Sequence, residues 1–169
     1  LAKYTSEQLL LMEVKNENVK DLLIVRPALV YGPGDIDDTY GPVRFTGAAV
    51  SNNKINLWGD GNEYRDFIYI GDILEILYRL ICRNSTGIFN LATGKSHSFR
   101  DVVNIVKSTT GKRLDISNRL RTKEKVDNKF IIIKLLNEIG IYAFTPLNKG
   151  IERTYYALLK NNDFDSSVN

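Results

Sequence analysis

Arg65 has a side chain of a type that suits the binding of an anion. It follows a turn-forming stretch from Gly59 to Asn62 and opens a strand-like run. A guanidinium group presents a planar fork of N–H donors that matches the oxygens of a phosphate group. Alternatively, Arg65 only pairs with Asp66 or Glu63 at the surface, where an ion pair contributes less than about 1 kcal/mol.

A second basic region lies farther along the chain. Residues 107–134 contain nine Lys and Arg against three Asp and Glu, whereas the whole chain has a net charge of only +3. This local excess suits a phosphate-bearing partner. A solvated basic surface explains it equally well. A nucleic-acid binder would more often interleave aromatic residues here, so we expect no nucleic-acid partner.

A loop with many turn residues follows the first apolar run of the chain. Residues 22–25 are Leu-Leu-Ile-Val, ended by Pro27, and predict a buried, parallel strand. The stretch from Tyr31 to Asp35 then reads as a loop. Ligands of open α/β sheets lie at the carboxyl ends of strands, so this loop is well placed for binding. A purely structural turn would explain its glycines equally well.

The composition excludes several classes of protein. The chain has one cysteine, Cys82, expected to be a buried packing residue, and one histidine, His97. These counts exclude a disulfide framework, argue against a zinc site or a cysteine nucleophile, and favour a reducing compartment. No run approaches the roughly 20 apolar residues of a membrane span, and no signal peptide opens the chain. We therefore expect a cytoplasmic protein with no membrane partner.

Periodicity and turn signals predict alternating helices and strands, which is the α/β class. Asp72 is expected to cap a helix, and Ser98 with Asp101 is expected to form a capping box. A polar tail, 161–169, is expected to be disordered. The helices are expected over 1–18, 43–51, 72–83, 98–110, 131–139 and 147–160, and the strands over 21–26, 54–58, 64–70, 87–92 and 114–116.

Two stretches, Arg26 to Asp35 and Arg65 to Ile73, together resemble the C-terminal half of the NAD-dependent epimerase/dehydratase family. These proteins are extended short-chain dehydrogenases that act on sugars carried on nucleotides. The resemblance covers nearly the whole chain. The family's first half, with its glycine-rich dinucleotide loop, has no match in this sequence. We therefore expect the chain to be a fragment, a processed product or the product of a truncated gene.

The resemblance implies an α/β fold made of the C-terminal part of a doubly wound, Rossmann-like sheet and a small mixed α/β substrate-binding region. The Rossmann-like part is expected in residues 1–36 and 62–95, and the substrate-binding region in residues 37–61 and 96–160.

The resemblance also implies a catalytic and cofactor-binding role for Lys3. In the family a tyrosine precedes such a lysine by four residues, which places both side chains on one helix face. The lysine lowers the pKa of the tyrosine and holds the nicotinamide ribose of NAD or NADP. The tyrosinate then takes a proton from a sugar hydroxyl as hydride leaves. Counting back four from Lys3 passes the chain start, so we expect this tyrosine to be missing, and Tyr4 points about 100° away from Lys3. Alternatively, Lys3 is solvated or pairs with Glu7.

Further site residues follow from the same resemblance. The backbone of Pro27 and Ala28 is expected to run beside the nicotinamide. Leu29 stands where members of the family often carry an asparagine that contacts the substrate. Arg65 is expected to grip the diphosphate of a nucleotide sugar. Asn90 is expected near the nucleotide, although backbone partners would satisfy its amide equally well.

Arg121 is the second expected phosphate ligand, with Arg119 as the close alternative. The predicted function is the C-terminal portion of an NAD(P)-dependent nucleotide-sugar epimerase or dehydratase, a homodimer as a full-length protein, with little activity or NAD binding by this chain alone. The alternative is a non-catalytic nucleotide-binding or assembly module derived from that family.

Overall fold

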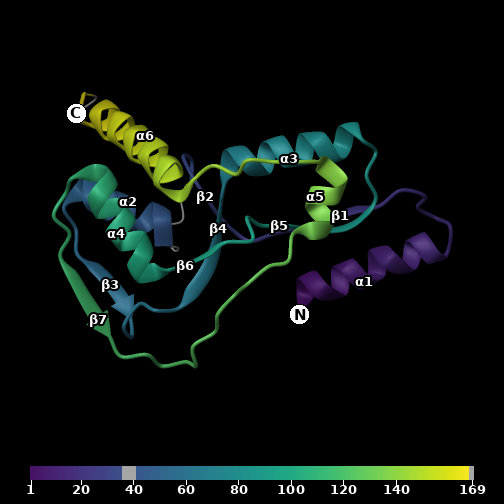
Figure 1. Cartoon of the computed structure of the whole chain (residues 1–169), viewed down its shortest axis with the longest axis horizontal. Helices are drawn as coiled ribbons and strands as arrows, with labels where there is room; N and C mark the ends of the chain where they lie inside the picture. The colour runs from purple at the N-terminus through teal and green to yellow at the C-terminus, as the bar shows by residue number, and fades with distance from the viewer. Residues whose placement is uncertain (36–40, 168–169) are drawn as a thin grey trace.

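The computed structural model describes residues 1–35 and 41–167, so the predicted domain boundary between 36 and 37 lies outside the described residues. Figure 1 shows the whole chain. The helices are α1 (Ala2–Lys15), α2 (Gly41–Ser51), α3 (Ile70–Cys82), α4 (Phe99–Thr110), α5 (Ile133–Ile139) and α6 (Leu147–Ser167). The strands are β1 (Leu23–Pro27), β2 (Leu29–Tyr31), β3 (Ile55–Trp58), β4 (Tyr64–Tyr69), β5 (Gly87–Leu91), β6 (Ser96–Ser98) and β7 (Ile116–Arg119).

The strands pair mainly in parallel, which confirms the α/β prediction. β1 pairs with β5, β2 with β4, and β3 with β7, all in parallel, and β6 adds to β4 in the antiparallel direction. The sequence patterns missed β2 and β6, which have three residues each. Strands this short offer too few residues for an alternating pattern to be read.

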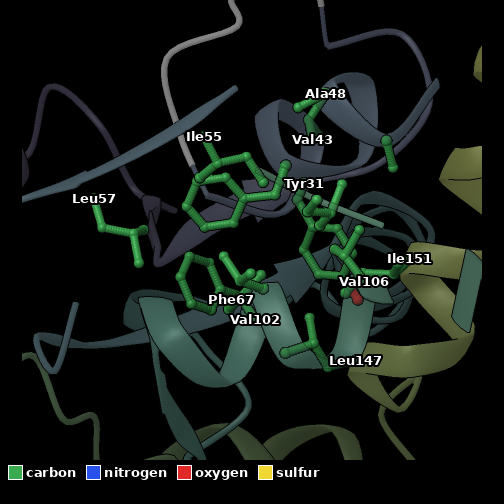
Figure 2. Close-up of a cluster of buried hydrophobic side chains, with 14 residues drawn as sticks. Tyr31, Val43, Ala48, Ile55, Leu57, Phe67, Val102, Val106, Leu147 and Ile151 are labelled. Carbon is green, nitrogen blue, oxygen red and sulfur yellow. The ribbon is translucent and has the colours of Figure 1, made fainter. Parts of the chain in front are cut away.

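Strand β4 divides two hydrophobic cores. Because side chains alternate across a strand, Phe67 enters one core and its neighbour Ile68 enters the other. The first core is shown in Figure 2 and is formed by β2, β3 and β4 with α2, α4 and α6. The second core joins β4 and β5 to α3 and α5. Arg65 has the same parity as Phe67, so it lies on the first-core side of β4 at the point where that core ends.

Each core depends on large aliphatic side chains that are completely or almost completely removed from water. Val102, Val106 and Ile151 are fully buried in the first core, and Ile76 and Leu80 are fully buried in the second. Burying one such side chain contributes about 1.5–3 kcal/mol. The first core therefore fixes β3 and β4 against three helices. The assignment of the chain to two domains stays a prediction.

Helix α1 is attached differently from the other helices. It has no buried residue, and Figure 1 shows it at the opposite end of the molecule from α6. Glu7 of α1 forms an ion pair with Arg26 of β1. The alternative in which Glu7 pairs with Lys3 is therefore wrong, because Arg26 takes its carboxylate.

The capping prediction is confirmed for α4 and wrong for α3. Ser98 Oγ accepts from the backbone N–H of Asp101, and the Asp101 carboxylate accepts from the N–H of Ser98, both at 3.0 Å. Helix α3 begins two residues before Asp72, and its N-cap, Tyr69, makes no side-chain capping bond. Asp72 is buried and instead accepts hydrogen bonds from Tyr142 Oη and from the backbone and hydroxyl of Thr145.

Two smaller expectations are also wrong. Cys82 is exposed rather than buried, because it ends α3 on the face that points away from the second core. The tail is helical rather than disordered over 161–167, since α6 runs to Ser167. No Gly or Pro interrupts this stretch, and adding a residue to an existing helix costs far less than starting one. Within residues 1–35 and 41–167, none of the helices is long and apolar enough to cross a membrane.

Candidate functional site

Arg65 is held at the start of β4 by three hydrogen bonds. Nη1 donates to the carbonyl of Tyr64 at 2.9 Å and to the carbonyl of Val126. Nη2 donates to the Glu63 carboxylate, with which it forms an ion pair. The Arg65 side chain is 18% exposed, so it is neither a solvated surface group nor fully buried. Arg65 thus pairs with Glu63, as the alternative prediction proposed, but the pair is largely buried and not at the surface.

Glu63 also binds the second predicted phosphate ligand. Its Oε2 accepts from Arg121 Nη1 at 2.7 Å, so one carboxylate bridges two guanidinium groups. We call Glu63, Arg65 and Arg121 the charged triad. Partial burial works to raise the pKa of Glu63, but the hydrogen bonds from Arg121 and Arg65 outweigh it and hold this pKa below its ordinary value. Glu63 is therefore ionised at neutral pH.

Two cavities adjoin the charged triad. The first, about 420 Å³, is lined by Arg65 and Glu63 together with Leu29 and the aromatic rings of Phe45, Trp58 and Phe99, among others. The second, about 530 Å³, is lined by all three residues of the charged triad and again by Trp58. Trp58, Glu63 and Arg65 line both. The structure thus brings Leu29, Arg65 and Arg121 to one place.

Trp58 is a candidate site residue that was not among the residues predicted from the sequence. Trp58 is 50% exposed, at the end of β3, and the Arg119 guanidinium lies over its ring, 5.9 Å from the centroid. Ile55 and Leu57 point into the first core, so alternation sends Trp58 to the other side. The sequence did carry a signal for Trp58, because it is a large aromatic residue at an outward strand position directly before a glycine turn. An exposed indole presents a flat apolar face to a ligand.

The segment after β7 is fixed against β4, which keeps the second cavity in place. Asp127 accepts from the backbone N–H of Tyr64 at 2.9 Å, and the N–H of Asn128 donates to the Tyr64 carbonyl at 3.0 Å. Arg121 packs against Gly59, where a Cβ atom would lie 3.3 Å from Nε of Arg121. Gly59 has a φ of +60°, so glycine serves both the turn and this close approach.

Asp66 has a structural position, because its carboxylate binds donors of the turn after β5 and not the Arg65 guanidinium. It is 1% exposed and accepts from the backbone N–H of Thr93, the Thr93 hydroxyl and the backbone N–H of Gly94. The predicted ion pair with Arg65 is therefore wrong, because successive strand residues point to opposite faces. Asp66 instead holds the turn after β5 against β4.

The remaining predicted residues form a second group, in which Pro27, Ala28 and Asn90 lie at the carboxyl ends of β1 and β5 and Lys3 lies on α1, whose Glu7 pairs with Arg26 of β1. Pro27 is exposed, and Ala28 donates its N–H to the carbonyl of Leu91 at 2.9 Å. Asn90 is half-buried, is in register with Arg26, and lines neither cavity beside the charged triad. Lys3 is exposed in the first turn of α1. The four predicted substrate residues are therefore not all brought together, since Asn90 lies in this second group.

Comparison with known proteins gives the family. The model of the NAD dependent epimerase/dehydratase family matches residues 1–92. A dTDP-4-dehydro-6-deoxy-D-allose reductase from a Streptomyces species is 28% identical over 149 residues, which are 83% of this chain and 44% of that protein. The chain therefore belongs to the NAD-dependent epimerase/dehydratase family, and the resemblance read from the sequence is confirmed.

Solved structures give the same fold. RMD from Pseudomonas aeruginosa, complexed with NADPH, superimposes with a TM-score of 0.84 at 18% identity, covering 94% of this chain and 55% of that one. The UDP-glucose 4-epimerase of Thermotoga maritima, with UDP-glucose, gives a TM-score of 0.82 at 22% identity, covering 99% and 53%. The predicted Rossmann-like α/β class is confirmed. The chain spans about half the length of the relatives it matches.

Proposed function

We propose that this chain is the nucleotide-sugar-binding portion of an NAD(P)-dependent epimerase or dehydratase. The observation that carries the proposal is the convergence of Arg65 and Arg121 on one cavity wall, beside the exposed ring of Trp58. Two guanidinium groups suit the two phosphates of a nucleoside diphosphate. The aromatic ring suits a base or a sugar face. Both parts of the ligand would then be held within this chain.

The hydrogen-bonding capacity of the two arginines supports a shared diphosphate. A guanidinium has five N–H donors. Among the described residues, Arg65 makes three donor contacts, which leaves two of the five, and Arg121 makes one, which leaves four. Arg121 is thus the better candidate than Arg119, whose guanidinium lies over the Trp58 ring.

NAD or NADP would be held at the second group of residues. The cofactor supplies the hydride acceptor for oxidation of a sugar carbon. Glu7 and Lys3 stand four residues apart, so they share one face of α1, and Glu7 fixes that face to Arg26 at the end of β1. Lys3, Pro27 and Ala28 therefore fit one end of a nicotinamide nucleotide. We propose Lys3 as the residue that holds the ribose and lowers the pKa of an acid/base group beside it.

Assembly and location complete the proposal. Leu9, Leu10 and Met12 of α1 are exposed apolar side chains, which supports burial of this helix against a second subunit or another part of a full-length homodimer. Cys82, the one cysteine of the sequence, is free, which suits a reducing compartment such as the cytoplasm.

A non-catalytic nucleotide-binding module is the second candidate. It is favoured by the exposure of Lys3, which forms no ion pair with any described residue. Incubation of a full-length protein that contains this chain with UDP-glucose and NAD separates the two candidates, because only an enzyme would convert the sugar. We expect no turnover by the 169-residue chain alone.

The proposal is tested by replacing Arg65. We expect Arg65→Ala to weaken binding of UDP-glucose by roughly 2–4 kcal/mol in calorimetric titration, because charge-assisted bonds to phosphate are lost in a partly desolvated site. Arg65→Lys should recover only part of the affinity, since an ammonium group lacks the planar fork. Arg79→Ala is the matched control, because Arg79 forms its ion pair on the surface of α3. Unchanged affinity in a folded Arg65→Ala protein would rule out the proposed site.

A further inference from the structure

The charged triad already contains an anion of the protein itself. The two oxygens of the Glu63 carboxylate bind one arginine each, with Oε1 on Arg65 and Oε2 on Arg121. A ligand that bridged the two guanidinium groups through the donors now bound to Glu63 would have to displace the Glu63 carboxylate. A ligand that used the remaining donors would still bind beside a carboxylate of the same charge sign.

Glu63 is only slightly exposed to water. Its side chain is 13% exposed, and those of Arg65 and Arg121 are 18% and 23% exposed. Charges in such a partly buried place are screened far less than charges at an open surface. The formal charge of the triad is +2 from the arginines and −1 from Glu63, which leaves +1 for an incoming diphosphate.

We propose that Glu63 is a built-in competitor of the ligand's diphosphate and so sets the affinity of the site. In the free chain its carboxylate binds Arg65 and Arg121, so a diphosphate that bridges the two arginines either takes these donors from Glu63 or binds beside its negative charge. The inference rests on the proposed function, because it assumes that the charged triad is the diphosphate site.

The opposite role, in which Glu63 mainly positions the arginines for the ligand, is disfavoured by their other contacts. Arg65 keeps its two Nη1 bonds to the Tyr64 and Val126 carbonyls without Glu63. Arg121 lies against Gly59, at the start of the turn that joins β3 to β4. Removing the negative charge should therefore leave both guanidinium groups near their places while raising the charge of the triad from +1 to +2.

The test measures binding of inorganic pyrophosphate to the 169-residue chain by calorimetric titration at fixed ionic strength. We expect Glu63→Gln to tighten binding about tenfold, because one competing charge-assisted contact is removed. Glu63→Asp keeps the charge but is one methylene shorter and cannot easily reach both arginines, so a smaller gain is expected. Glu75→Gln is the matched control, because it removes the same charge from the exposed Glu75–Arg79 pair on α3.

The outcomes are separable. Unchanged or weaker pyrophosphate binding by folded Glu63→Gln, or no binding to either protein at millimolar concentration, overturns the role of Glu63. An equal gain in Glu75→Gln overturns it too, because net charge alone would then explain the effect. If Glu63→Gln gains affinity for pyrophosphate while Arg65→Ala leaves UDP-glucose binding unchanged, the proposed function fails and Glu63 still competes at an anion site.

Discussion

The charged triad and helix α1 carry the two halves of the proposed chemistry, and the chain holds them very differently. Arg65 and Arg121 are each bonded to Glu63, and the strand beneath them separates two cores. Helix α1, which carries Lys3, has no buried residue and joins β1 through the Glu7–Arg26 pair. The comparison shows that many contacts within this chain hold the proposed substrate site in place, whereas few hold the helix of Lys3, the proposed cofactor residue.

The difference has a consequence for folding. Positions within a packed core resist displacement, because every shift costs contacts on several sides. An exposed ion pair usually contributes less than about 1 kcal/mol. The region around the charged triad should therefore unfold only with the whole chain, whereas α1 should open locally.

The largest effect is expected from Asp66→Ala. Asp66 is buried and accepts three hydrogen bonds from Thr93 and Gly94, so its removal leaves the backbone N–H groups of these two residues without a partner beside β4. We expect a loss of about 3–5 kcal/mol in the free energy of unfolding, measured by urea denaturation. Asp115→Ala, which breaks an exposed pair with Lys54 at 3.8 Å, should cost under about 0.5 kcal/mol. Similar losses of stability in the two variants would contradict the stabilisation of β4 by the hydrogen bonds of Asp66.

A smaller global effect but a clear local one is expected from Arg26→Ala. Without this side chain Glu7 has lost its partner, so α1 should exchange its amide hydrogens faster in hydrogen-exchange mass spectrometry. The free energy of global unfolding should change by less than about 1 kcal/mol. Arg79→Ala is the control, because it breaks a comparable pair on α3, a helix that also has a buried face. Equal protection of α1 in Arg26→Ala and the unaltered chain would show that other contacts hold this helix.

The smallest effect is a pH dependence of stability caused by Glu63. Its pKa is lowered from an ordinary 4.5 in the folded chain, so the unfolded state binds the proton more readily. The stabilisation is fully present above pH 4.5 and is lost as the pH falls through the lower, folded pKa. The difference in unfolding free energy between the chain and Glu63→Gln should shrink on acidification below that value. A difference independent of pH would mean that the arginines do not stabilise the Glu63 carboxylate.

The sequence predicted much of the fold because many elements carry strong local signals. The capping box of Ser98 and Asp101 was recognisable, since capping depends on residues three apart. Asp72 shows the limit of the same reasoning. A carboxylate near a helix start is a plausible cap, but its partners, Tyr142 and Thr145, are about seventy residues away and were invisible to local pattern.

Candidate residues were recognisable from the sequence, whereas their grouping was not. Arg65, Arg121 and Leu29 were candidates through their types and the family resemblance, and the fold brings them beside two adjoining cavities. Asn90 was a candidate on the same grounds, but the parallel pairing of β5 with β1 puts it opposite Arg26. Strand pairing decides which candidate residues lie together, because the neighbour of a strand in the sheet brings residues that are distant in sequence to the same place.

The α/β class, most helices and strands, and the family could be recognised from the sequence alone, because hydrophobic period, turn residues and family motifs are local. The folded chain was needed to see that Glu63 joins Arg65 to Arg121, that Asp66 supports a turn, and that Trp58 is exposed beside them. Most of these contacts join residues that lie far apart along the chain. Arg121 lies fifty-eight residues from Glu63, so their contact exists only once β3, β7 and the segment after β7 have packed.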